Sequence, residues 1–225
     1  MTSSNVSFNQ TVESSTKERI LRAAESLFAE NGFDATSHRM ITAAAGVNLA
    51  AVNYHFHSKD DLIRAVLARR IGPVNQRRLE LLREHLAAAG EAPPSLEGII
   101  RAFVEPVVML RKQAECSGVG RLFGRTYVEP SGIVRKAFFE LMREIGRPFT
   151  EAFRRALGDL PQVEFLWRMH FSVGVLAHTL AGTEHLATIS GGLCDPSDAE
   201  GIVDRIVAFI AAGMRAPLPE KLNRS

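Results

Sequence analysis

The stretch VNLAAVNYHFHSKDDL concentrates side chains that could bind a charged ligand. Val52 and Phe56 share one face of a short predicted helix at i, i+4 spacing, so Tyr54 and His55 point elsewhere. Lys59 follows in the first turn of the next helix, where acidic residues are usually preferred. A lysine there, together with the exposed N–H groups of that turn, suits a phosphate group.

Enzyme signatures are absent from the sequence: it has no G-x-x-x-x-G-K-[ST], no G-x-S-x-G and no H-E-x-x-H. Gly118, Gly120 and Gly124 approach the dinucleotide fingerprint, but their spacing is wrong and no strand precedes them. We therefore expect no enzyme. The rival hypothesis is an enzyme acting on acyl chains with His170 or His178 as base, although no nucleophile is recognisably paired with either histidine.

A metal site is a second hypothesis for the histidines, since Glu184 and His185 lie near His178 in sequence. His170 and His178 are eight positions apart, more than two helical turns, so they cannot hold one ion without a further partner. Hydrogen-bonded histidines in a core or pocket are the alternative. We expect neither a metal nor a cofactor.

The segment RMITAAAG, residues 39–46, predicts a second short helix just before the one that contains Val52 and Phe56. Met40, Ile41 and Ala44 are expected to face inward. Gly46 ends it where the chain must turn sharply. Two short helices joined at this glycine make a helix-turn-helix. A pair of helices packed inside an all-α core is the alternative, but the outward side chains are not the aliphatic ones that such packing favours.

An earlier helix is predicted from a capping box at Ser15 and Glu18 to a stop at Asn31-Gly32. Residues 1–14 are polar and without periodicity, which predicts a disordered arm. Ser58 caps a long helix, and the Gly72-Pro73 pair inside it should produce a kink.

Helical patterns continue to the end of the chain, with none that alternates at period two. They cover roughly Leu96–Gln113, Cys116–Val128, Ser131–Leu157, Pro161–His185 and Ser197–Met214. The prediction is an all-α fold of about nine helices.

Composition allows a full hydrophobic core, since 46% of the 225 residues are hydrophobic. Residues 15–70 carry eight Lys/Arg and six Asp/Glu (net +2), and residues 71–225 carry 19 and 18 (net +1), a difference that permits nucleic-acid binding without arguing for it. No apolar run approaches the roughly 20 residues of a membrane span, and the N-terminus lacks a leader pattern, so we expect a cytoplasmic protein with no membrane partner. Cys116 and Cys194 are expected to be ordinary thiols.

Residues 16 to about 65, and above all TAAAGVNLAAVNYHFHSKDDL from Thr42, resemble the TetR family of bacterial one-component transcriptional regulators. Three runs, LAAVNYHF, EFLWRMHFSVG from Glu164 and FIAAGMRA from Phe209, are similar to fatty-acid-responsive repressors of that family. Thr42 departs from the usual alanine, and we expect its hydroxyl to bond back to the carbonyl of His38.

The resemblance implies a DNA-binding surface and assigns residues to it. The implied DNA contacts are His38, Arg39, Leu49, Ala50, Ala51, Asn53, Tyr54, His55 and Lys59. Tyr54, His55 and Lys59 are suited to phosphates. Asn53 could pair with an adenine, Arg39 with a guanine, and the two alanines could touch thymine methyl groups.

The resemblance also implies the domain organisation and the partners. The expected parts are the arm at 1–14, a helix-turn-helix domain at 15–65, a ligand-binding and dimerisation domain at 66–215, and a tail at 216–225. The expected partners are double-stranded operator DNA, a second copy of the chain, and a small apolar effector such as a long-chain fatty acid or acyl-CoA that releases a repressor from DNA. A lipid carrier with a vestigial helix-turn-helix is the rival hypothesis.

Two stripes on the predicted helix at 161–185 bear on the dimer. Trp167, Phe171, Val175 and His178 form a bulky stripe that we expect to face the core, and Gly174, Ala177 and Ala181 form a small one. By resemblance, this helix and the last one pair with their copies in a four-helix dimer interface, with the small stripe at the contact. A monomer that packs these helices internally is the alternative.

An effector cavity is expected among the bulky apolar residues of the second domain, although a plain core would explain the same residues. The expected ligand-binding residues are Phe103, Val107, Arg121, Phe123, Arg125, Phe138, Met142, Trp167, Phe171 and His178. Arg121 or Arg125 could meet an acyl carboxylate or a coenzyme-A phosphate.

Overall fold

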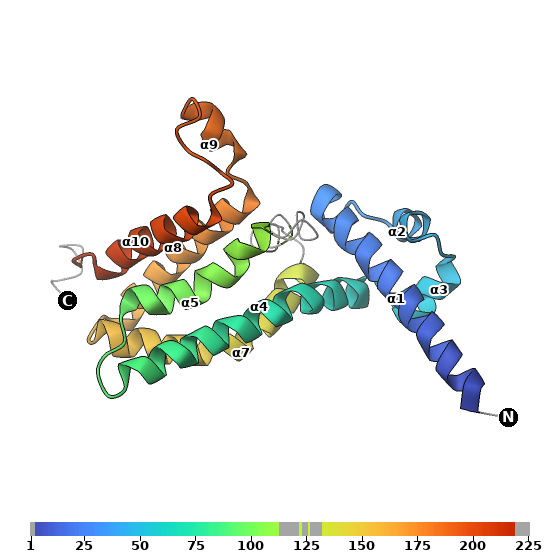
Figure 1. The fold of residues 1–225 in the computed structure, drawn as a ribbon, viewed down its shortest axis with the longest axis horizontal. Helices are drawn as coiled ribbons and strands as arrows, with labels where there is room; N and C mark the ends of the chain where they lie inside the picture. The colour runs from blue at the N-terminus through green and yellow to red at the C-terminus, as the bar shows by residue number, and fades with distance from the viewer. Residues whose placement is uncertain (1–2, 113–121, 123–125, 127–131, 219–225) are drawn as a thin grey trace. The chain divides into compact units, whose positions relative to one another are not determined.

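The computed structural model describes residues 3–112, 122, 126 and 132–218, and Figure 1 shows that their regular structure consists of helices joined by loops. The elements are α1 (Ser3–Asn31), α2 (His38–Ala45), α3 (Leu49–His55), α4 (Lys59–Ala89), α5 (Leu96–Val108), the 3-10 helix η1 (Met109–Lys112), α7 (Gly132–Leu157), α8 (Gln162–Ala181), α9 (Glu184–Ile189) and α10 (Ala199–Arg215). The described residues thus contain nine α-helices and no strand, which confirms the predicted all-α fold.

Two compact units make up the chain. The first comprises residues 1–72 with 125–141, and the second comprises residues 73–124 with 142–225. Both α4 and α7 contribute residues to each unit. None of the helices in the described ranges is long and apolar enough to span a membrane.

The core of the first unit is formed where α1, α2 and α3 pack on the first turns of α4. Its buried side chains include Ile20, Phe28, Phe33, Ile41, Val52, Phe56, Leu62, Ile63, Val66 and Leu67. On α2, Ile41 and Ala45 face this core, whereas Met40 is 36% exposed and Ala44 is exposed. The predicted inward positions of Met40 and Ala44 were wrong because the neighbouring i, i+4 stripe of this short helix is the buried one.

The first helix begins at Ser3, well before the predicted start at Ser15. Ser15 therefore lies inside α1 and is not its N-cap, and residues 3–14 are helical where an arm was predicted. These residues contain no glycine or proline, so no helix breaker separates them from the rest of α1.

The start of α4 is capped as predicted. The hydroxyl of Ser58 accepts the backbone N–H of Asp61 at 3.1 Å and donates to the carboxylate of Asp61 at 2.7 Å. The helix continues through Pro73 to Ala89, and the kink expected at this proline stays a prediction.

In the second unit, α10 packs along α5 and α8. Two ion pairs join α10 to α5: Arg215 with Glu97, and Arg101 Nη2 with Asp204 Oδ1 at 2.5 Å. Apolar side chains of α10, among them Val203, Val207 and Ile210, are buried.

Two helix boundaries in this unit differ from the predictions, and a third predicted helix cannot be compared. The predicted helix at 161–185 ends at Ala181, because Gly182 has φ 156°, and the separate short helix α9 follows. The predicted helix at 96–113 changes to a 3-10 turn after Val108. The predicted helix at 116–128 and the glycines at 118, 120 and 124 lie outside the described residues, apart from residues 122 and 126.

Candidate nucleic-acid interface

The turn between α2 and α3 is built by a glycine in the left-handed region. Gly46 has φ 62° and ψ 41°, its N–H donates to the carbonyl of Ala43, and the N–H of Val47 donates to the carbonyl of Thr42. This pair of bonds is a Schellman motif, which stops a helix and turns the chain. The predicted helix-turn-helix is therefore present, with its turn at the predicted glycine.

The short helix α3 is fixed at both ends. Asn48 is its N-cap, as predicted, and the side chain accepts the N–H of Ala51 at 2.8 Å. Val52 is fully buried and Phe56 is 4% exposed, which confirms that these two side chains anchor the helix. An anchored face of two residues leaves the opposite flank of α3 available.

That flank reaches the solvent. Tyr54 is 67% exposed and Leu49 is 51% exposed. Ala50, Asn53 and, on α2, Arg39 are also exposed, while Ala51, His55 and Lys59 are half-buried. The predicted DNA contacts thus lie together on α2, α3 and the first turn of α4, and their individual roles stay predictions.

His38 differs from the other members of this set. It is half-buried, and its Nε2 atom is buried with no hydrogen-bond partner among the described residues. The Nε2 side of the ring therefore faces the protein, and a DNA contact would have to come from another part of the residue.

Lys59 already makes a hydrogen bond within the first unit. Its Nζ donates to the carbonyl of Asp34, in the loop before α2, at 3.1 Å. An ammonium group has three donors, so this bond positions the lysine and leaves donor capacity for a phosphate.

The hydroxyl of Thr42 bonds to a different backbone carbonyl from the one predicted. Its hydroxyl donates to the carbonyl of Arg39 at 3.0 Å, and the predicted acceptor was His38. The correction is a shift from i−4 to i−3, both of which a threonine can reach in a helix.

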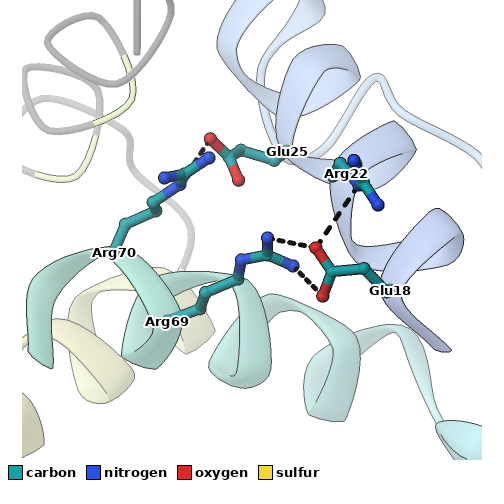
Figure 2. Close-up of polar contacts among 5 residues, drawn as sticks. All are labelled: Glu18, Arg22, Glu25, Arg69 and Arg70. Carbon is teal, nitrogen blue, oxygen red and sulfur yellow. Dashed lines mark hydrogen bonds and ion pairs between the residues drawn. The ribbon is translucent and has the colours of Figure 1, made fainter. Parts of the chain in front are cut away.

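Two ion pairs connect α1 to the part of α4 that belongs to the first unit (Figure 2). Glu18 accepts two hydrogen bonds from the guanidinium of Arg69, one of them at 2.7 Å, and Glu25 accepts from Arg70 at 2.6 Å. Arg22 adds a third cation, 3.3 Å from Glu18. The hydrogen bonds from Arg69 lower the pKa of Glu18. Sequence analysis missed these pairs because their members are 45 and 51 positions apart and no local spacing marks them.

A small apolar cavity lies in the second unit among α5, α7, α8 and α10. It is lined by Ile100, Phe103, Val104, Phe153, Met169, Ser172, Val173, Leu176 and Ile210. Its volume of about 20 Å³ is enough for one or two water molecules. In the described residues this cavity is a narrow apolar seam between helices, and the expected effector site stays a prediction.

Most of the predicted ligand-binding residues do not line this cavity. Phe103 lines it, but Val107 is fully buried elsewhere, Phe138 belongs to the first unit, and Met142 is half-buried away from it. Trp167, Phe171 and His178 are exposed, and Arg121, Phe123 and Arg125 lie outside the described residues.

A buried arginine that sequence analysis did not identify contacts Phe103, one of the residues that line the cavity. Arg78 on α4 is 1% exposed, and its Nε donates to the carbonyl of Phe103 at 2.7 Å. Its guanidinium carbon lies 4.1 Å from the centroid of the Phe103 ring, and its Nη1 donates to Asn75 at 3.1 Å. Arg78 therefore links α4 of this unit to a side chain that lines the cavity.

The bulky stripe of α8 does not face the core of the chain, so that part of the prediction was wrong. Trp167 is 54% exposed and Phe171 is 60% exposed, whereas Leu176 and Leu180 are buried. The helix is apolar on nearly every side, so sequence periodicity alone does not identify the face that packs. Of the small stripe, Gly174 and Ala181 are exposed but Ala177 is buried within the chain.

Other large apolar side chains near Trp167 and Phe171 are exposed as well. They are Val163 and Leu166 on α8, and Phe209, which is 68% exposed, on the neighbouring α10. The two helices run side by side in Figure 1. An exposed apolar surface of this kind usually marks an interaction site.

The described residues hold no group of three or more potential metal ligands. The rings of His178 and His185 are 5.8 Å apart in an edge-to-face arrangement, and the side chain of Glu184 lies outside the described part. His170 packs edge-on against Trp167.

Comparison with known proteins gives matches over both units. A family model described as bacterial regulatory proteins, tetR family, matches residues 20–66, and one described as a tetracyclin repressor-like C-terminal domain matches residues 101–213. The HTH-type transcriptional regulator UidR of Escherichia coli K12 is 38% identical over 58 residues, which are 26% of this chain and 30% of UidR. The chain thus spans less than a third of the length of the curated relatives it matches.

Solved structures with a similar fold include two fatty-acid regulators. The fatty acid degradation regulator FadR from Bacillus halodurans has a TM-score of 0.61 at 14% identity, over 90% of this chain and 97% of that one. FadR from Bacillus subtilis, in complex with stearoyl-CoA, has a TM-score of 0.62 at 14% identity, over 87% and 98%. These identities are low, so the similarity shows the fold alone. The family models, which together cover the helix-turn-helix and most of the helical second unit, show that the chain belongs to the TetR family of bacterial transcriptional regulators.

Proposed function

We propose that the chain is a homodimeric repressor that binds operator DNA through α3 and is released by a small apolar effector. The observation that carries the proposal is the construction of α3, which is held down by Val52 and Phe56 and presents an exposed flank with Asn53 and Tyr54. A helix held on one side only can enter the major groove of DNA, which is wide enough for one helix.

The side chains around α3 divide by the part of DNA they suit. Lys59, His55 and Tyr54 offer hydrogen-bond donors to phosphates, which fix register without reading sequence. Arg39 and Asn53 are exposed and have the donor and acceptor geometry that reads guanine and adenine edges.

In vitro selection from random duplexes tests the DNA part of the proposal. We expect a palindromic site with half-sites about 10 base pairs apart or a multiple of that, because a symmetric dimer presents two copies of α3. Arg39→Ala should relax the selected sequence at one base pair in each half-site, and Lys59→Ala should leave the sequence unchanged. Failure to select any sequence would favour the lipid-carrier hypothesis if the protein still bound acyl ligands.

The exposed apolar face of α8 and α10 supports the dimer. Trp167, Phe171 and Phe209 are large, exposed apolar side chains on adjacent helices, and a second copy of the chain would cover them. Trp167→Ser should weaken the dimer at least tenfold while the monomer stays folded, because the side chain is exposed in the single chain. Sedimentation equilibrium measures this change, and Leu193→Ser on the loop after α9 is the control.

The effector is the least constrained part of the proposal. The runs EFLWRMHFSVG and FIAAGMRA resemble PsrA, a fatty-acid-responsive repressor, and the Bacillus subtilis protein of similar fold was solved with stearoyl-CoA. The cavity is apolar but has only about 20 Å³, whereas ligand pockets usually have ~300–1,000 Å³. We therefore propose that a long-chain fatty acid or acyl-CoA binds by separating the side chains that now fill the seam.

The effector must act through the difference in its affinity for two conformations. A ligand shifts DNA affinity only as far as it prefers the state that binds DNA poorly. Thermal unfolding with palmitate, palmitoyl-CoA and butyrate tests this step: the long-chain compounds should raise the melting temperature and lower operator affinity. Butyrate controls for the carboxylate and should do neither.

A further inference from the structure

We infer that Arg19 on α1 is a positioning residue for DNA recognition: it fixes the turn between α2 and α3 and so sets the orientation of α3. The inference rests on the proposed function for its DNA readout, and it has a second readout that does not need DNA.

The contacts are two hydrogen bonds from one nitrogen. Nη2 of Arg19 donates to the carbonyl of Ala45 at 2.6 Å and to the carbonyl of Gly46 at 2.7 Å. Arg19 is thereby joined to the last residue of α2 and to the glycine of the turn, 26 and 27 positions away. A single guanidinium connects α1 to the point where the chain changes direction.

Neither of these two carbonyls accepts a hydrogen bond from the backbone N–H groups of the turn. The last carbonyls of a helix have no partner within the helix. The Schellman bonds from Gly46 and Val47 are accepted by Ala43 and Thr42, so they do not serve Ala45 or Gly46. A cation at the C-terminus of α2 also interacts favourably with the negative end of its helix dipole.

Gly46 and Arg19 are fitted to each other. The positive φ of Gly46 already disfavours any side chain there, and a Cβ atom added to it would lie 2.9 Å from Nη2 of Arg19. The glycine thus gives the guanidinium room to approach the turn, where it donates to the carbonyls of Ala45 and Gly46.

The turn matters for α3 because α3 cannot hold its own direction. The helix has seven residues, too short to be stable alone, and only two residues separate Gly46 from its first residue. Val52 and Phe56 fix its depth against the core. The conformation at Ala45 and Gly46 then sets the direction in which α3 leaves the turn, and DNA affinity depends on that direction because base contacts require precise placement.

A competing explanation is that Arg19, which is exposed, itself binds a DNA phosphate. The two roles differ in their salt dependence. Losing a phosphate contact reduces the slope of log affinity against log salt by about one unit and weakens all duplexes alike. Losing a positioning contact weakens the selected operator more than random DNA and leaves the slope unchanged.

The experiment compares Arg19→Gln and Arg19→Lys with Arg22→Gln. Arg22 is the matched control, since it lies on the same helix, is also exposed, carries the same charge and pairs with Glu18 and not with the turn. Affinities for the selected operator and for a random duplex are measured over a salt series, together with the melting temperature. We expect Arg19→Gln to lose about tenfold in operator affinity relative to Arg22→Gln, with equal affinity for random DNA and an unchanged slope. Arg19→Lys should fall between, because an ammonium group reaches one carbonyl but lacks the planar guanidinium.

Amide hydrogen exchange over residues 47–56 is the second readout, and it is independent of DNA. Arg19→Gln should accelerate exchange of these amides more than Arg22→Gln does. If Arg19→Gln fails to fold, Arg19→Lys carries the same comparison.

Two results would overturn the inference: equal behaviour of the Arg19 and Arg22 variants in both readouts, or a loss on all duplexes with a smaller slope. If the unmodified protein binds no duplex at all, the proposed function fails, and hydrogen exchange alone still decides whether Arg19 holds the turn.

Discussion

The proposed DNA-binding surface of the first unit and the apolar cavity of the second are built over different distances along the chain. In the first, Asn48 caps α3 by accepting the N–H of Ala51, Val52 lies one turn from Phe56, and Ser58 bonds with Asp61. Each of these pairs lies within four positions along the chain. In the second, Ile100, Phe153, Leu176 and Ile210 come from four helices that span more than a hundred positions. The comparison teaches that a surface made of local contacts is specified by a short sequence, whereas a cavity is specified only by the packing of the whole unit.

The largest effect is expected from Phe56→Ala. The side chain is 4% exposed, and removing a buried phenylalanine costs about 3–5 kcal/mol. The first unit should unfold at a lower temperature and operator binding should be lost, while the oligomeric state measured by sedimentation is retained by the second unit. Tyr54→Ala, two residues away on the exposed flank, is the control for stability. A variant that still bound the operator with wild-type affinity would contradict the anchoring role of Phe56.

The second prediction concerns truncation of a buried side chain that lines the cavity. Leu176→Ala should destabilise the protein by about 2–4 kcal/mol and enlarge the cavity that the side chain lines. A long-chain fatty acid should then restore more melting temperature to this variant than it adds to the wild type. The control is Leu180→Ala, one turn along α8, which is equally buried but does not line the cavity. Equal recovery in both variants would place the effector elsewhere.

Patterns in the sequence predicted the first region well because its contacts join residues that are close together along the chain. The cap at Asn48, the anchors Val52 and Phe56, the turn at Gly46 and the cap at Ser58 each follow from residue types a few positions apart. In the same unit, local patterns did not identify which of two neighbouring stripes of α2 is buried, and Met40 and Ala44 were wrongly predicted to face inward.

Contacts between distant positions escaped prediction. Arg19 at the turn, Glu18 with Arg69, and Arg78 under Phe103 are each more than 20 positions apart. On α8, where apolar residues surround the helix, the buried face depends on packing against distant elements such as α10, and Trp167 and Phe171 were assigned to the wrong side. Chain-distant charge pairs and helices that are apolar all round are thus the two features that single-sequence patterns leave open.

A third prediction tests whether Lys59 contacts a DNA phosphate without reading the base sequence. Lys59→Ala should weaken binding to all duplexes alike and reduce the salt-dependence slope by about one unit, as loss of one phosphate contact does. Its bond to the carbonyl of Asp34 is lost as well, so the melting temperature is measured alongside. Arg64→Ala, on the same helix and paired with Asp61, is the control for charge. An altered base preference in a competition titration would show that Lys59 reads sequence.

The smallest effect concerns a long-range contact of the second unit, the ion pair between Glu97 on α5 and Arg215 at the end of α10, 118 positions apart. Hydrogen bonds from Arg215 lower the pKa of Glu97 from 4.5 to about 2. A carboxyl group whose pKa is lower in the folded state adds stability above its unfolded pKa, and that stability is lost as the pH falls from about 4.5 toward 2. Because the Glu97 side chain is 45% exposed, solvent screening reduces the contribution to about 0.5–1 kcal/mol.

Urea unfolding of the wild type and Glu97→Gln over a pH series measures this contribution. At pH 7 the variant should be less stable by that amount, and the two curves should approach each other as the pH falls toward 2 and meet below it, where Glu97 becomes protonated in both folded and unfolded protein. Comparing the variant with the wild type at each pH removes the titration of all other carboxylates. A difference that persisted unchanged at pH 2 would mean that Glu97 joins α5 to α10 by packing and not by charge. Of the two ion pairs between α5 and α10, only the one from Arg101 to Asp204 would then be left to act through charge, whereas in the first unit Glu18 and Glu25 both hold α1 to α4 through arginines.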